Sequence, residues 1–124
     1  MLPVFLIEEA TVREGGESSP VALGEGSADG ILITLGVTHV IEQQSLDVDI
    51  LVSEDGVAWN PFPAGSFLRK FYCGTYQILV PRSRARFLKA AWRLNRWGSG
   101  DHGPYCRFYL YAQSARVRAM AGAA

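Results

Sequence analysis

Apolar and polar side chains alternate along this chain with a period of two residues, and this feature constrains its fold more than any other. Residues 46–53 show it plainly, with Leu46, Val48, Ile50 and Val52 on one face and Asp47, Asp49 and Ser53 on the other. No long stretch holds the i, i+3, i+4 apolar spacing of an amphipathic helix. The pattern predicts strands with one dry and one wet face, as in the sheets of a sandwich.

The same periodicity recurs from one end of the chain to the other. It predicts strands at residues 4–12, 31–42, 46–53, 67–73, 75–80, 86–97 and 105–113, with a further short one at 21–23. Seven or eight strands with short turns predict an all-β, antiparallel β-sandwich of jelly-roll type. We expect residues 1–113 to form this single domain and residues 114–124, which lose the alternation, to form a flexible tail.

Size and composition are those of one globular domain. The chain has 124 residues, of which 48% are hydrophobic and 19% charged, unlike a disordered chain or a membrane protein. Its apolar runs are a few residues long, so we expect no membrane insertion. The N-terminus shows no basic stretch and no cleavage site typical of a signal peptide, which predicts a cytoplasmic protein.

The two cysteines, Cys73 and Cys106, form no CxxC motif and have no histidine at metal-ligand spacing. We therefore expect no zinc site and no cofactor. Both lie among aromatic residues, which is typical of small buried side chains on strands. Free thiols are the prediction, although spacing alone leaves a disulfide open.

Charge is distributed unevenly although the net charge is zero. Residues 1–60 hold eleven acids and one base, whereas residues 61–124 hold one acid and eleven bases. One explanation is that acidic and basic strands lie side by side in a sheet. The other is a subunit with an acidic and a basic face that stacks head to tail. The zero net charge argues against a nucleic-acid partner, because strong nucleic-acid binders usually carry a net basic charge.

Residues 48–59 contain a strand, a Ser-x-Asp-Gly turn and Trp59, and Asp55-Gly56 is a turn signal because glycine supplies positive φ. This segment resembles the discoidin (coagulation-factor type C) domains, which are galactose-binding-like jelly rolls. The strand at residues 85–90 is similar to the next hallmark of that family, and the resemblance covers about half of the chain. It implies a site for sugars or lipid head groups in loops at one end of the sandwich, here residues 59–65 and 97–105.

Catalytic groups are scarce, so we do not expect an enzyme. His39 lies in phase with the inward residues of its strand, which predicts a strand-end or half-buried histidine and not a catalytic base. His102 stands beside Asp101 in a glycine-rich loop, where such residues are ordinary loop polars unless a fold assembles them with partners. Asp47 and Asp49 lie on a plain strand, which does not indicate a glycosidase pair.

The loop at residues 95–105 is the strongest candidate site. Its candidate ligand-binding residues are Asn95, Arg96, Trp97, Asp101, His102 and Tyr105. An aromatic plane with amide, guanidinium and carboxylate groups matches the C–H face and the hydroxyls of a sugar. The structural alternative is that Trp97 plugs the end of the sandwich. As an assembly interface, the patch would be extended by outward-facing residues, namely Phe87, Arg93, Tyr109 and Tyr111.

Two functions follow from these observations. The first is a non-catalytic recognition module that binds carbohydrate or a similar polar ligand through its end loops. The second is a self-assembling structural subunit, as in phage tails, that uses its acidic and basic faces. The expected partners are a glycan or a protein, or further copies of the chain as a homo-oligomer.

Overall fold

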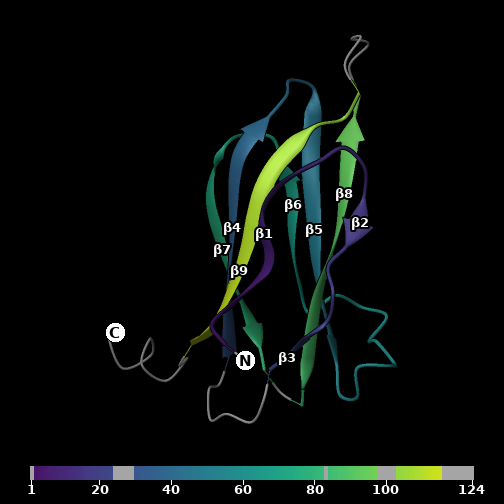
Figure 1. Ribbon diagram of the computed structural model, residues 1–124, viewed down its shortest axis with the longest axis vertical. Coiled ribbons are helices and arrows are strands. Elements are labelled where there is room, and N and C mark those ends of the chain that lie inside the picture. The colour runs from purple at the N-terminus through teal and green to yellow at the C-terminus, as the bar shows by residue number, and fades with distance from the viewer. Residues whose placement is uncertain (1, 24–29, 83, 98–102, 116–124) are drawn as a thin grey trace.

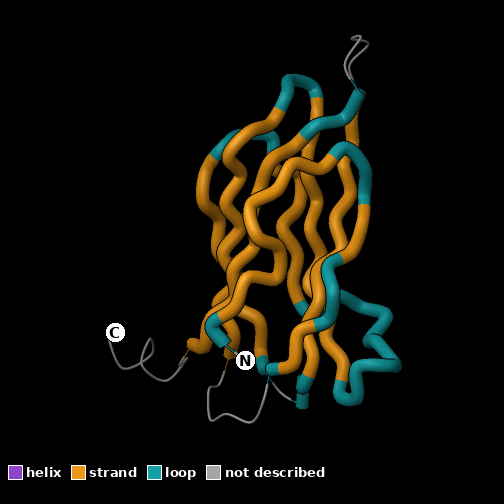
Figure 2. The backbone as a smooth tube through the Cα atoms, in the orientation of Figure 1, coloured by secondary structure: helices purple, strands orange, loops and turns teal. Residues whose placement is uncertain are grey.

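The computed structural model describes residues 2–23, 30–82, 84–97 and 103–115, which form two antiparallel sheets packed face to face (Figure 1). One sheet has the order β1 (Val4–Val12), β9 (Cys106–Ala115), β4 (Gly30–Val40), β7 (Gly74–Pro81). The other has the order β2 (Gly16–Glu17), β8 (Phe87–Arg96), β5 (Gln44–Ser53), β6 (Gly65–Lys70), and β3 (Val21–Ala22) also pairs with β8. The described residues contain strands and loops and no helix (Figure 2). The predicted all-β sandwich is confirmed.

The long strands lie close to their predicted positions, and the differences are at their ends. The described residues form nine strands, against the seven or eight expected, because β2 and β3 are two-residue segments that pair with successive parts of β8. The strand expected at residues 67–73 ends at Lys70. The last strand continues to Ala115, two residues beyond its predicted end. The remainder of the expected tail, residues 116–124, lies outside the described residues.

The core is formed by the inward faces of both sheets. Its fully buried side chains include Ile31, Ile33 and Leu35 of β4, Leu46, Val48 and Ile50 of β5, Leu88 of β8, and Phe108 and Leu110 of β9. Trp92 packs against this cluster, with its ring 5.9 Å from that of Phe108, and donates its indole N–H to the Glu14 carbonyl. Trp92 is thus a core residue, as its phase with Leu88 and Leu94 predicts.

His39 lies at the end of its strand, which is one of the two predicted alternatives, but it is not half-buried, because a β-bulge changes the phase of β4. Val37 pairs with Phe108 and His39 with Arg107, so β4 carries one extra residue at this point. The bulge turns His39 outward beside Thr38, and both are exposed. The His39 ring then lies 5.0 Å from that of Tyr105, edge to face.

Acidic and basic strands lie next to each other, as the first explanation of the charge distribution requires. Asp47 stands opposite Arg93 in the β5–β8 ladder, and Arg93 forms a salt bridge with Asp49. Burial alone would raise the pKa of the Asp49 carboxyl, but hydrogen bonds from Arg93 and Ser66, together with the Arg93 charge, outweigh it and lower the pKa. Two more pairs, Lys89 with Glu17 and Arg107 with Glu9, also join neighbouring strands.

Gln44 anchors the segment that enters β9. Its side chain is only 1% exposed, donates to the Tyr105 carbonyl at 2.6 Å and accepts from the Tyr105 N–H at 2.9 Å. The buried Gln44 amide thus provides hydrogen-bond partners for both the N–H and the C=O of Tyr105. These two bonds replace those that a neighbouring strand would otherwise provide. It therefore holds the start of β9 against the start of β5.

Replacing Gln44 with alanine should lower the free energy of unfolding by about 2 kcal/mol, because two backbone groups lose their partners. Urea denaturation measures this loss. Gln77→Ala is the matched control, since the exposed Gln77 makes a single side-chain bond, to Thr34, and its loss should cost less than about 1 kcal/mol. Equal losses in the two variants would contradict the anchoring role of Gln44.

Both cysteines are free thiols, as predicted, but only Cys106 is buried. Cys73 is exposed because β6 has already ended and residues 71–73 carry the chain from one sheet to the other. Burial, with a smaller contribution from Cys73, raises the pKa of the Cys106 thiol to about 12.

Ellman's reagent at pH 8 should therefore modify one thiol per native chain, since the thiolate is the reactive form and Cys106 is neutral and enclosed. The second thiol should react only after unfolding in urea. Cys73→Ser should abolish the native reaction. Two rapid equivalents from the folded chain would show that Cys106 is accessible.

Candidate functional site

The two loops implicated together by the discoidin resemblance lie at opposite ends of the sandwich. In the antiparallel β5–β8 ladder, Ser53 stands opposite Phe87 and Gln44 opposite Arg96. The loop that follows β5 is therefore beside the start of β8, whereas the loop that follows β8 is beside the start of β5. Residues 59–65 and the described part of the other loop, Trp97 and residues 103–105, therefore cannot form one site within a single chain.

Trp97 does not plug the end of the sandwich. Its side chain is 55% exposed and meets the ring of Phe71 edge to face at 5.7 Å. Phe71 in turn contacts Tyr72, and both are exposed. Three aromatic residues from two loops thus gather on the surface at this end, of which the sequence identified Trp97.

The structure places only part of the predicted ligand-binding set. Asn95 is exposed near the end of β8, and Arg96 donates from Nη1 to the Gly103 carbonyl while its Nε is buried without a hydrogen-bond partner among the described residues. Tyr105 is held by Gln44, and its ring also lies under the guanidinium of Arg13 at 5.1 Å. Asp101 and His102 lie outside the described residues. The assignment of these six residues as a site stays a prediction.

The expected extension of that patch does not form. Phe87 and Arg93 lie on β8 in one sheet, whereas Tyr109 and Tyr111 lie on β9 in the other. Side chains on the outer faces of two packed sheets point in opposite directions. These four residues therefore belong to two separate surfaces.

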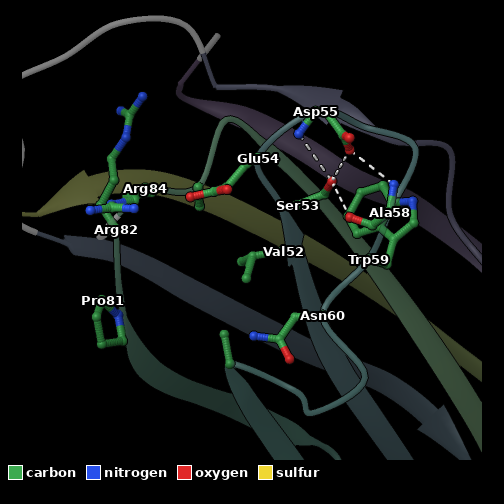
Figure 3. A pocket seen from close by; sticks show the side chains of 12 residues that line it. Val52, Ser53, Glu54, Asp55, Ala58, Trp59, Asn60, Pro81, Arg82 and Arg84 are labelled. Atoms are coloured by element: carbon green, nitrogen blue, oxygen red, sulfur yellow. Dashed lines mark hydrogen bonds between the residues drawn. The ribbon is translucent and has the colours of Figure 1, made fainter.

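A cavity of about 570 Å³ opens at the other end, between the loop after β5 and the loop after β7 (Figure 3). Its lining residues are Val52, Ser53, Glu54, Asp55, Ala58, Trp59, Asn60, Ala64, Pro81, Arg82, Arg84 and Ala85. In Figure 3, Arg82 and Arg84 lie on one side, the turn from Ser53 to Trp59 lies on the other, and Glu54 extends between them. The lining combines apolar side chains with charged and amide groups.

The Ser53 hydroxyl organises one wall of the cavity. It lies 2.6 Å from the Ala58 carbonyl and accepts hydrogen bonds from the N–H groups of Asp55 and Gly56. Gly56 has a φ of 80°, as the Asp-Gly turn signal predicts. Ser53 was expected to face outward with Asp47 and Asp49. It is buried instead, because the turn folds back over its hydroxyl.

Asp55 closes the same turn. Its Oδ1 accepts from the N–H groups of Val57 and Ala58, each at 2.9 Å. These two bonds, followed by the one from the Ser53 hydroxyl, hold the pKa of the Asp55 carboxyl below its ordinary value. Asp55 is therefore a structural carboxylate at neutral pH, and Glu54 is the neighbouring carboxylate that remains available to a ligand.

Arg82 and Arg84 were not foreseen as members of a site. They follow β7 and are about 30 residues from the turn in sequence, so no local motif joins the two segments. A backbone hydrogen bond holds the two segments together instead, since the Arg86 N–H donates to the Ser53 carbonyl at 2.9 Å. The Trp59 ring is half-buried, and the Lys89 ammonium lies over it at 4.5 Å from its centroid.

Neither a cluster of potential metal ligands nor a membrane-spanning helix is found in the described part of the chain. Among those residues, no three His, Cys, Asp or Glu side chains gather in a group that would hold a metal ion. The same residues include no helix with the length and apolar character needed to cross a bilayer.

Replacing Ser53 with alanine should destabilise the chain by about 1–3 kcal/mol, because the turn loses its central hydroxyl. The pKa of Asp55 should rise toward its ordinary value, which carboxyl NMR titration measures. In the wild type this carboxylate stabilises the folded state above its unfolded pKa of about 3.9, and that stability is lost as pH falls through the lower folded pKa. Ser114→Ala on β9 is the control, and an unchanged Asp55 pKa in Ser53→Ala would refute the arrangement.

Comparison of the chain with protein-family models, with curated proteins and with solved structures finds no match.

Proposed function

We propose that this chain is a non-catalytic recognition module that binds a saccharide, or a similar polyhydroxylated ligand, in the end cavity between the loops after β5 and β7. One observation carries the proposal. A concave space of about 570 Å³ combines apolar side chains with a guanidinium pair, an amide and a carboxylate. Sites for small polar ligands have this combination, in which apolar walls bury the ligand and a few polar groups orient it.

The polar groups suit hydroxyls in particular. Each sugar hydroxyl both donates and accepts, so its site needs acceptors as well as donors. Glu54 accepts, the guanidinium group of Arg84 donates, and the Asn60 amide does both, although its Oδ1 also accepts from the Phe62 N–H. Two arginines balance Glu54 and Asp55, which favours a ligand without net charge.

The same cavity does not favour catalysis. Its two carboxylates, Glu54 and Asp55, are adjacent in sequence, and Asp55 is engaged by two backbone N–H groups. Acid–base hydrolysis of a glycoside requires two carboxyl groups that face the bond from opposite sides. The described residues of the lining include no histidine or cysteine that would serve as a base or a nucleophile.

We further propose that the sandwich is a jelly roll. The pairs β1 with β9, β2–β3 with β8, β4 with β7 and β5 with β6 enclose one another along the chain. Such nesting is what a long hairpin produces when it folds over into two sheets of four strands. It supports the topology that the discoidin resemblance implies, whereas a shared fold does not by itself specify a ligand.

Calorimetric titration with a panel of neutral mono- and oligosaccharides tests this function. Arg84→Ala removes an exposed guanidinium from the cavity. The affinity for any saccharide that the wild type binds should fall by about tenfold or more. Glu54→Gln should weaken it in the same direction.

Trp97→Ala is the control at the opposite end, and it should leave the affinity unchanged. Loss of binding in Trp97→Ala with normal binding in Arg84→Ala would move the site to the loop at residues 95–105. No binding by the wild type across the panel would refute saccharide recognition.

A further inference from the structure

A second concave surface lies on the outer face of the sheet β1–β9–β4–β7, away from both ends. It is a groove of about 630 Å³ lined by Phe5, Glu8, Glu9, Thr34, Tyr109 and Tyr111. Phe5, Glu8 and Glu9 come from the edge strand β1, Tyr109 and Tyr111 from β9, and Thr34 from β4. Neither end loop contributes to it, so it is distinct from the end cavity.

Irregular pairing of the edge strand creates this groove. Phe5 pairs with Tyr111, and Ala10 pairs with Phe108. Between these two pairs β1 therefore advances by five residues, whereas β9 advances by three. Two extra residues in a short stretch make a strand bend away from its partner and redirect its side chains. Glu8 and Glu9 both fall in the second bulge, opposite Tyr109.

Three aromatic rings line the groove at different inclinations. The Phe5 ring lies 4.8 Å from that of Tyr111 at an interplanar angle of 54°, and 6.1 Å from that of Tyr109 at 76°. Tyr109 lies directly over Gly36, where a Cβ atom would be only 2.0 Å from its ring. Phe5 is 46% exposed, although it is a large apolar side chain. A compact group can touch more than one of these rings, whereas a flat ligand can stack on only one.

The charge of the groove is negative. Glu9 forms a salt bridge with Arg107, which also bonds Thr11, whereas Glu8 has no ion-pair partner among the described residues. The two carboxylates and Arg107 leave a local charge of −1. Among the described residues, no lysine, arginine or amide side chain lines the groove, and the Thr34 hydroxyl already accepts from Gln77.

We propose that this groove binds an organic cation, namely an ammonium group that carries methyl substituents. Aromatic faces attract cations through their quadrupoles, and the Glu8 carboxylate adds a full opposite charge. Methyl groups supply apolar contact with the rings and weaken the hydration of the charge. A saccharide fits less well, because its hydroxyls need donors as well as acceptors, and the charged groups of the lining only accept.

Choline and its neutral isostere 3,3-dimethyl-1-butanol provide a matched test, since the two differ in charge and hardly in shape. The wild type should bind choline in an NMR titration, with shifts centred on Tyr109 and Tyr111, and the isostere about tenfold more weakly or worse. Equal affinity for both compounds, or no binding of choline, overturns the proposal. Binding of neutral saccharides that depends on Phe5 overturns it as well.

Variants locate the site. Phe5→Ala and Glu8→Gln change exposed side chains and should each weaken choline binding several-fold. Gly36→Ala keeps every lining side chain but displaces the Tyr109 ring, and it should weaken binding too. Circular dichroism and urea denaturation identify any variant that has lost its fold.

Two controls separate this proposal from the proposed function. Glu42→Gln removes an exposed carboxylate between β4 and β5, and Arg84→Ala alters the end cavity; both should bind choline normally. Choline binding that Arg84→Ala abolishes and Phe5→Ala preserves overturns the groove assignment. Saccharide binding is scored separately, so either proposal can fail without the other.

Discussion

The rest of the structure depends on the antiparallel ladder between β5 and β8, which pairs ten consecutive residues from Gln44–Arg96 to Ser53–Phe87. Its inward side chains fill the core, and its outward ones pair Asp49 with Arg93. β5 begins and ends with a buried polar residue, and each of the two side chains bonds the backbone of a neighbouring segment. Gln44 holds the start of β9, whereas Ser53 organises the turn beside the end cavity. A slip of one residue would exchange the inward and outward faces and remove both anchors.

The two concave surfaces differ in how they form and in their chemistry. The end cavity brings together loops that follow β5 and β7, and it offers donors and acceptors with balanced charge. The groove on the outer face arises within a sheet, from an irregular edge strand, and it offers rings and carboxylates. The same scaffold thus presents two chemically different environments, and single substitutions can alter each separately.

Period-two alternation was sufficient to predict the sandwich and its long strands, because burial on one face imposes that period directly on the residues. Bulges were not predictable. One extra residue after Val37 turned His39 outward, and the two in β1 aligned Glu8 and Glu9 with Tyr109, without any composition signal. Arg82 and Arg84 were missed because long-range pairing brings them to the turn at Ser53.

The separation of the two predicted loops could have been deduced from the number of strands between them. Three strands, β6, β7 and β8, lie between the loop after β5 and the loop after β8, and an odd number of crossings leaves the chain at the opposite end. A family resemblance compares the order of motifs along the chain. It therefore does not show at which end of the sandwich each loop lies.

The bulged course of β1 also affects how two molecules can meet. β1 is an outer strand of its sheet, and a straight outer strand offers a regular row of N–H and C=O groups to which a neighbouring chain can add. In β1 that row is interrupted twice within a few residues, and two glutamates stand at the second interruption. A second molecule therefore finds no continuous template along this border, and the sheet ends there.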